Sequence, residues 1–99
     1  MPLKHHEPRE KLPDKVLDQH RAIASLIEEL EAVMWYHERA AVTEDEDLRA
    51  VIEHNRDEEI EHAMMNLEWV RRSWPEFDDQ MKTYLFTDKP ITDVEENDD

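Results

Sequence analysis

The chain contains no glycine, and its five prolines stand at positions 2, 8, 13, 75 and 90. Because these two residues most often interrupt helices, the uninterrupted spans 14–74 and 76–89 favour long helices joined by tight turns. A chain of 99 residues makes one domain with a modest hydrophobic core. We therefore expect a helical domain that completes its core with a partner chain.

Apolar residues at alternating steps of four and three predict a first helix over about residues 14–41. His20 takes one position of this coiled-coil-like seam, and the other members are Val16, Ile23, Ile27, Leu30 and Met34. Thr43, followed three residues later by Glu46, predicts a capping box that opens a second helix over about 44–73.

A third, shorter helix is predicted after Pro75, which ends the second helix because proline disfavours the helical conformation of the residue before it. Helical spacing places it over 76–86, packed across the end of the hairpin, and its apolar residues are Phe77, Met81, Tyr84 and Leu85. Residues 1–13 are then an extended arm, 14–86 the helical hairpin domain, and 87–99 an acidic tail expected to be disordered. The expected fold class is all-α, an antiparallel two-helix hairpin plus a short C-terminal helix.

The net charge of −15 limits the possible partners. Nucleic acid and anionic membrane surfaces need a basic patch, so neither is expected as a partner. The chain has no apolar run of a signal peptide and no membrane span, and it lacks cysteine, which excludes disulfides and thiolate chemistry. We expect a soluble, cytoplasmic protein whose natural ligands are cations.

The stretch HNRDEEIEHAMMNLEW, residues 54–69, places polar residues where a helix should bury apolar ones. At about 100° per residue, the apolar face of the second helix comprises Leu48, Val51, Ile52, Ala63, Trp69 and Val70. Four polar residues fall in the middle of that face, namely Asn55, Glu59, His62 and Asn66. An isolated charge there is costly unless it is paired or binds a metal.

Glu59 and His62 are neighbours on the helix surface and can share one metal ion, for which iron, manganese and zinc are suitable. On the first helix, Glu29 lies at the edge of the apolar stripe. One inward Glu on one helix and E-x-x-H on another make half of the ligand set of a four-helix di-iron carboxylate site. Two chains related by a two-fold axis would complete a dinuclear site with these three residues from each.

The run from Asp18 to Phe86, which contains HRAIASLIEELEAVMWY, HNRDEEIEHAMMNLEWVRR and TYLFT, strongly resembles the encapsulated ferritins. These are ferritin-like proteins housed inside encapsulin nanocompartments of prokaryotes. The resemblance implies a homodimer that forms a ferritin-like four-helix bundle, with five dimers in a ring-shaped homodecamer. It also implies a ferroxidase that oxidises Fe(II) with dioxygen and supplies iron for storage in the encapsulin shell. The expected location is inside such a nanocompartment in the cytoplasm.

The same resemblance assigns roles to individual residues. The implied ligands of two irons per subunit pair are Glu29, Glu59 and His62. A supporting role beside these ligands falls to Tyr36. An outer cation site, where ions enter and where calcium or another divalent cation could bind, is implied at Glu28, Glu31 and Trp35.

One feature departs from the family. Its members usually carry a C-terminal peptide of small and apolar residues that docks to the shell, and DVEENDD does not resemble it. The encapsulin partner therefore follows from the resemblance and not from this tail. Truncation, a fusion to the shell protein and a different mode of recruitment all remain open.

Two other functional hypotheses use the same residues. In the first, zinc or calcium staples a structural helical oligomer without turnover, since the preferred ligand types overlap. In the second, the chain is an acidic interaction protein in which Asn55 and Asn66 only set helix register. That second hypothesis leaves the ionisable pair Glu59 and His62 less well explained.

The remaining histidines are expected to be peripheral. We expect His54 to be a structural or surface residue and His37 to be a satisfied interface histidine. His5 and His6 lie in the arm, where they could bind metal adventitiously, and the sequence assigns no role to His20.

Overall fold

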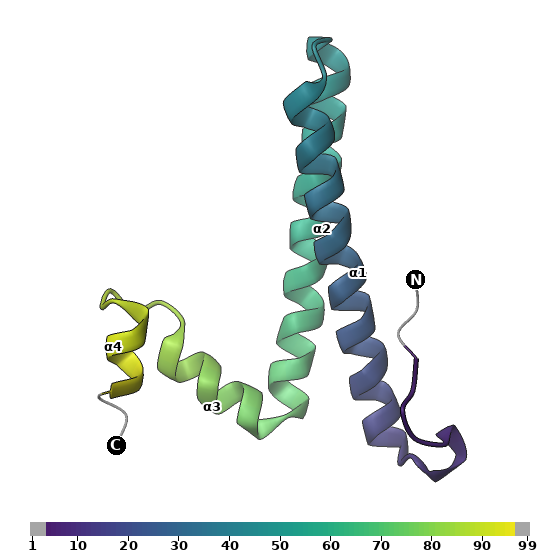
Figure 1. Cartoon of the computed structure of the whole chain (residues 1–99), viewed down its shortest axis with the longest axis vertical. Helices are drawn as coiled ribbons and strands as arrows, with labels where there is room; N and C mark the ends of the chain where they lie inside the picture. Colours follow the sequence, from purple (N-terminus) through teal and green to yellow (C-terminus); the bar gives the residue numbers. More distant parts are fainter. Residues whose placement is uncertain (1–3, 97–99) are drawn as a thin grey trace.

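Two long helices, α1 (Asp14–Val42) and α2 (Glu46–Ser73), form an antiparallel hairpin in the computed structural model, which describes residues 4–96. Figure 1 shows the hairpin upright, with α3 (Pro75–Tyr84) leaving its lower end sideways and leading to α4 (Ile91–Glu96). Every regular element of the described residues is helical. The predicted fold class, an all-α hairpin with a short C-terminal helix, is confirmed.

Side-chain contacts between the two long helices fix their register. Near the open end of the hairpin, the Gln19 amide donates to the backbone carbonyl of Ser73 over 3.4 Å. Near the turn, Arg56 Nη1 lies 3.1 Å from His37 Nδ1. A guanidinium only donates hydrogen bonds, so His37 accepts with Nδ1 and carries its proton on Nε2. This is the satisfied histidine that the sequence predicts, although its partner belongs to the same chain.

The hairpin buries very little. The buried apolar residues of the described chain are Ala40, Ala63, Val70 and Val94. Four members of the seam predicted on the first helix are between 37% and 56% exposed, namely Val16, Ile27, Leu30 and Met34. The hairpin therefore leaves much of this seam uncovered.

The turn between the long helices corrects the predicted capping box. Thr43 does not cap α2; it follows the end of α1, where its hydroxyl donates to the Arg39 carbonyl over 2.6 Å. The N-cap of α2 is Asp45, whose Oδ1 accepts from the Leu48 backbone N–H over 2.8 Å. Because aspartate caps at least as well as threonine, the second helix begins at Glu46 and not at 44.

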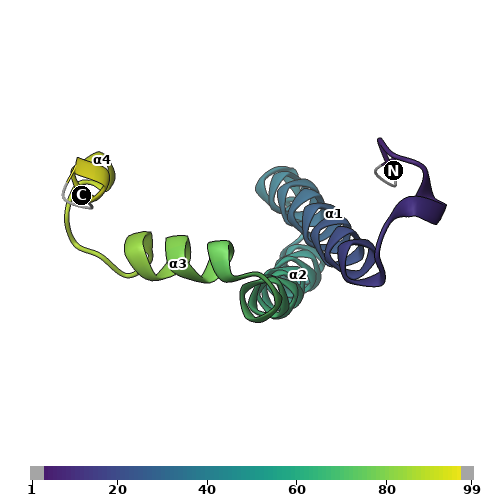
Figure 2. The same ribbon diagram turned by 90° about the horizontal axis from the view of Figure 1, so that it is seen from below.

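Helix α3 starts one residue earlier than predicted, because Pro75 has no N–H to lose and fits the first helical position. It ends at Tyr84 and not at 86. Leu85 is extended and Phe86 has a positive φ of 62°, a conformation that an α-helix does not contain. Figure 2 shows that α3 points away from the hairpin, so the predicted packing across its end is wrong.

Charged residues hold α3 in this direction. The Arg71 guanidinium donates to both carboxylate oxygens of Glu68 over 2.8 Å and also to Asp78 of α3. Lys82 Nζ lies 2.9 Å from the other oxygen of Asp78. We call these four residues the elbow. The elbow connects α3 to α2, and α3 does not contact α1.

The two ends of the chain are more ordered than predicted. In the arm, Arg9–Lys11 form one turn of 3-10 helix, called η1, where the sequence predicts an extended chain. In the acidic tail, Ile91–Glu96 form α4, which buries Val94 and packs on α3. That burial explains why this part of the tail is helical and not disordered, while residues 97–99 lie outside the described part. Within residues 4–96, no helix is long and apolar enough to cross a membrane.

Candidate metal centre

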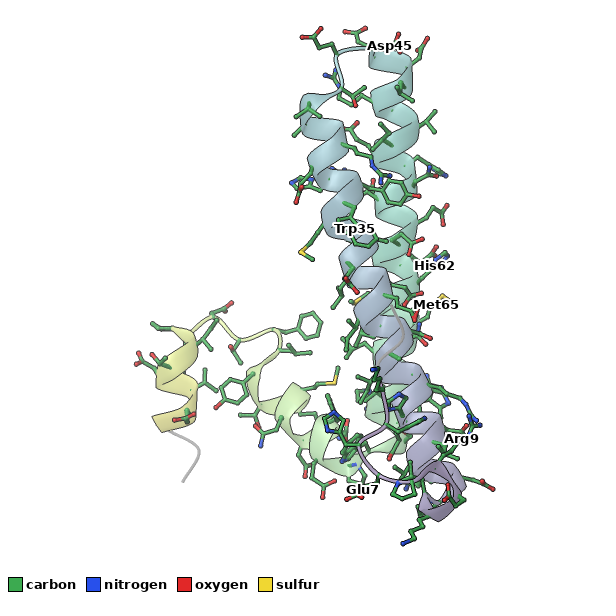
Figure 3. The ribbon with its side chains drawn as sticks, turned by 45° about the vertical axis from the view of Figure 1, so that its right-hand side comes forward. Glu7, Arg9, Trp35, Asp45, His62 and Met65 are labelled. Carbon is green, nitrogen blue, oxygen red and sulfur yellow. The ribbon has the colours of Figure 1, made fainter. Side chains whose placement is uncertain are left out.

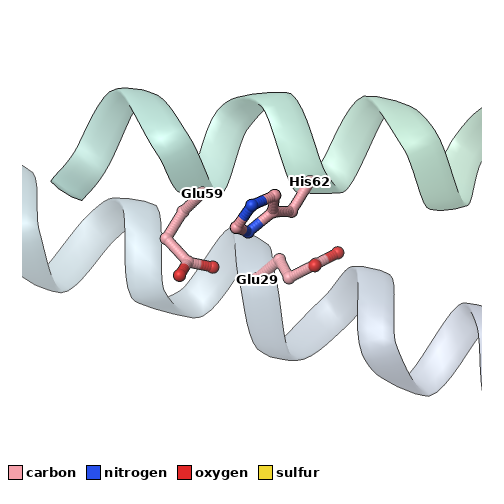
Figure 4. Close-up of side chains that lie close together, drawn as sticks. All are labelled: Glu29, Glu59 and His62. Carbon is pink, nitrogen blue, oxygen red and sulfur yellow. The ribbon is translucent and has the colours of Figure 1, made fainter. Parts of the chain in front are cut away.

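The three residues predicted as metal ligands lie together in the middle of the hairpin. Glu29 comes from α1, and Glu59 and His62 come from successive turns of α2 (Figure 4). One ligand atom of each lies within 4.8 Å of the other two. The helical spacing of Glu59 and His62 and the register of the hairpin thus produce the predicted group within a single chain.

An amide side chain orients Glu29. Asn66 Nδ2 donates to Glu29 Oε1 over 2.7 Å, and it also lies 3.5 Å from the His62 carbonyl oxygen. One oxygen of Glu29 is therefore held by this bond. The sequence does not decide the role of Asn66, because a bond across the hairpin cannot be identified from spacing on one helix.

The centre carries uncompensated negative charge. Glu29 and Glu59 are half-buried, whereas His62 is exposed. Among residues 4–96, no Lys or Arg forms an ion pair with either carboxylate. Two carboxylates that approach each other without a cation repel, so a bound metal ion would lower the energy of this arrangement.

The donors fit a particular class of metal. Two carboxylates and one imidazole suit iron, manganese or zinc better than the soft metals that prefer thiolates. Three donors from one chain do not fill a coordination sphere of four to six, which leaves room for further ligands. The chemistry of the donor set thus fits iron.

A second group of possible ligands shares His62. It contains Glu58 and Glu61 with that histidine, and its ligand atoms also lie within 4.8 Å of one another. His54 extends it along the outer face of α2, because its Nε2 lies 3.3 Å from Glu58 Oε1. Glu58 lies four residues from both His54 and His62, and this spacing is the signal in the sequence that could have identified it, whereas Glu61 is adjacent to His62.

The other predicted site residues lie apart from this centre. Tyr36 is half-buried two turns along α1 from Glu29, with Arg39 Cζ 5.4 Å from the centre of its ring. Glu28 and Trp35 are exposed, and Glu31 is half-buried. Neither group of possible metal ligands in the described residues includes Glu28 or Glu31. The supporting role of Tyr36 and the outer cation site therefore stay predictions.

Comparison with known proteins identifies the family. Residues 4–88 match the family described as EncFtn-like. The chain belongs to the EncFtn-like family. The predicted resemblance to encapsulated ferritins is thereby confirmed. The candidate metal-binding Glu and His residues fit iron binding in a ferritin-like protein.

Relatives of this family match most of the chain. A ferritin-like protein of Thermotoga maritima is 58% identical over 93% of this chain and 81% of its own length. An encapsulated ferritin-like protein of Rhodospirillum rubrum is 51% identical over 91% of this chain, which spans 64% of that relative. A crystal structure of a protein from Nitrosomonas europaea has a TM-score of 0.85 and 55% identity, covering 88% of this chain and 96% of the other.

Proposed function

We propose that this chain is a ferroxidase subunit that oxidises Fe(II) to Fe(III). The observation that supports this most directly is the convergence of Glu29, Glu59 and His62 within 4.8 Å in a member of a ferritin-like family. Carboxylates and imidazole bind Fe(II) moderately, and hard carboxylate oxygens favour the higher charge of Fe(III). Dioxygen is the proposed electron acceptor.

The residues of the chain bind and orient the metal. Glu29 and Glu59 attract Fe(II) by their negative charge, and Asn66 holds Glu29 in the orientation needed for binding. His62 would bind through a neutral nitrogen. When bound, the irons supply the electron-transfer chemistry, and the protein contributes the fixed positions of its ligands. A net charge of −15 on the chain raises the local concentration of cations around the centre.

The complete site is proposed to lie between two chains. His62 is exposed and lies near Met65 on α2 (Figure 3). Apolar residues before and after His62 on this helix are exposed too, with Val51 at 56%, Met65 at 65% and Trp69 at 42%. A second chain placed over this surface would bury those residues and bring three further ligands to the metal. The result is a dimeric four-helix bundle with two irons per subunit pair, and five such dimers in a homodecamer.

Two further assignments follow from the family. Glu28, Glu31 and Trp35 are proposed to form the outer cation site, with calcium or another divalent cation as ligand, and Tyr36 to support the iron ligands. The relative from Rhodospirillum rubrum is named as encapsulated. We propose that the present chain also binds an encapsulin shell protein and is located inside that compartment in the cytoplasm.

The test is oxidation of Fe(II) by the purified chain, followed by absorbance in the near ultraviolet. Glu29→Ala, Glu59→Ala and His62→Ala should each slow the reaction by at least about 100-fold, since each removes a ligand. Glu38→Ala is the matched control, because this exposed Glu of α1 lies outside both groups of possible ligands. Oxidation at the native rate by all three variants would contradict the proposal.

The alternative is a structural metal clip at the same residues, which the shared ligand chemistry supports equally well. Anaerobic loading with Fe(II), followed by exposure to air, separates the two functions. A ferroxidase should give a ferric absorbance band within the mixing time, with assembly dependent on metal. A clip should assemble with zinc or Fe(II) alike and should show no change in the spectrum on exposure to air.

A further inference from the structure

The charges of the chain are strongly segregated. Residues 1–21 contain five Lys and Arg against four Asp and Glu, and three of the six histidines. Residues 22–99 contain the other seven Lys and Arg against 23 Asp and Glu. The N-terminal part therefore has a formal charge of +1, whereas the rest of the chain has a formal charge of −16.

The fold places four of the eight basic residues of this part around one hollow. The arm folds back beside the first turns of α1 (Figures 1 and 3), so that the rings of His5 and His20 lie 4.2 Å apart. A hollow of about 340 Å³ is lined there by both histidines and by Arg9 and Arg21. Four basic side chains from the arm and from α1 therefore line the same hollow.

Few acidic groups oppose them. Glu28 also lines the hollow, and Asp18 accepts one hydrogen bond from Arg21 Nη1 over 2.7 Å. A guanidinium has five N–H donors, so Arg21 keeps others for a ligand. Loss of surrounding water and then the charges of His20, Arg9 and Arg21 lower the pKa of His5 below its usual value of 6.5. The charges of these neighbours are part of the reason that a further positive charge on His5 is disfavoured, although loss of water is the larger cause.

We propose that this hollow binds a small inorganic oxyanion of the phosphate type. Guanidinium forks match the oxygens of a tetrahedral anion in two directions, and imidazole N–H groups add single donors. A ligand there would connect the arm to α1, since it would contact residues of both. A metal cation fits worse, because two guanidiniums repel it. Neither group of possible metal ligands in residues 4–96 includes His5 or His20.

The hollow shares only Glu28 with the proposed outer cation site and no residue with the metal centre, so the proposal is tested without iron. Sulfate, whose charge is constant, and inorganic phosphate are titrated into the full chain at constant ionic strength and slightly acidic pH, while the imidazole signals are followed by NMR. Saturable shifts confined to His5 and His20 are expected. His6, which precedes the same arm turn and does not line the hollow, provides the internal control. Shifts that rise linearly without saturation would overturn the proposal.

Variants separate a built site from general attraction. Arg9→Ala should weaken sulfate binding about tenfold, since a charge-assisted bond is lost. Lys11→Ala removes the same charge from the same turn η1 but not from the lining, and it should leave the affinity within about twofold. Equal losses in both variants would overturn the proposal. Glu28→Gln should strengthen binding, because it removes the one carboxylate of the lining.

Two more probes define the ligand. Glycerol phosphate carries the same group on an organic body, and the proposal expects it to bind no more tightly than inorganic phosphate. A preference for the ester of tenfold or more would show that the hollow serves an organic phosphate instead. Zinc added without anions should not shift His5 and His20 together at concentrations where sulfate does; tight zinc binding there would overturn the assignment as an anion site.

Discussion

The metal centre joins α1 to α2 and the elbow joins α2 to α3, and these two clusters of charged residues satisfy their charges in opposite ways. At the elbow, the carboxylates of Glu68 and Asp78 each have a cation of the same chain, because Arg71 donates to both. At the centre, Glu29 and Glu59 approach each other with only the neutral Asn66 amide bonded to one of them. A charge cluster that supplies its own counterions supports the fold, whereas one that lacks them is suited to recruiting a cation from solution.

A cationic side chain introduced at the metal centre should give its carboxylates a counterion from the same chain, as at the elbow. His62→Lys places an ammonium beside Glu29 and Glu59, so we expect Fe(II) oxidation to fall by at least about 100-fold. Thermal unfolding of the metal-free variant should occur at a temperature no lower than that of the native chain, because the carboxylates gain a partner. His54→Lys on the exposed face of the same helix is the control. A variant that retained oxidation would show that the charge deficit is not what binds iron.

The hydrogen bond that orients Glu29 can be removed without removing a metal ligand. Asn66→Ala deletes the 2.7 Å bond to Glu29, and loss of such a supporting bond should lower iron affinity or activity about tenfold. Asn55→Ala is matched in residue type and helix, but its side chain is not bonded to a ligand in the described structure. Equal effects of the two substitutions would indicate that both asparagines act on helix register alone.

The elbow should respond to acid in a way that sharpens the contrast. Hydrogen bonds from Arg71 and then Arg72 lower the pKa of Glu68 from 4.5 to about 2. Because the folded pKa is depressed, the contribution of Glu68 to stability is present above its ordinary pKa and is lost as the pH falls toward 2. NMR titration of the Glu68 carboxyl carbon should show this low pKa in the native chain.

In the Arg71→Gln variant, the pKa of Glu68 should move back toward its ordinary value, and α3 should lose its fixed direction. Arg49→Gln, at a position distant along α2, should leave the titration of Glu68 unchanged. An unaltered titration in Arg71→Gln would mean that the elbow does not neutralise this carboxylate in solution.

The smallest effect concerns a carboxylate that a backbone group satisfies. Asp45 accepts the Leu48 N–H at the start of α2, and Asp45→Ala should lower the free energy of unfolding by about 1 kcal/mol. Thr43→Ala should have a smaller effect, because its hydroxyl only donates to the Arg39 carbonyl at the end of α1. Denaturant unfolding of both variants measures the difference, and the reverse order would restore the capping box predicted from the sequence.

The sequence predicted the parts that depend on periodicity. Both long helices and the convergence of Glu29, Glu59 and His62 follow from spacing along each helix and from a hairpin of matched lengths. The cap was missed because Thr43 and Asp45 both suit an N-cap, and only the backbone decides between them. The bond from Asn66 to Glu29 depends on the relative rotation of two helices, which spacing on either one does not determine.

The direction of α3 could not be predicted from the sequence for a related reason. Its apolar spacing indicated a helix but not the surface against which the helix packs. The decisive contacts join Arg71 to Asp78 across the junction at Trp74, and many other pairings were possible in a chain with 39% charged residues. The same holds for α4, where burial of Val94 outweighs the acidic composition of the tail.

The scarcity of buried side chains has a consequence for how the protein survives in solution. Only four apolar residues of the described chain are shielded from water, so a lone hairpin has little to oppose the entropy of the unfolded chain. By mass action, a chain that gains its core from another copy becomes more resistant to heat as it becomes more concentrated. For the proposed dimer, dilution, and not only temperature, should therefore lead to unfolding and to proteolysis.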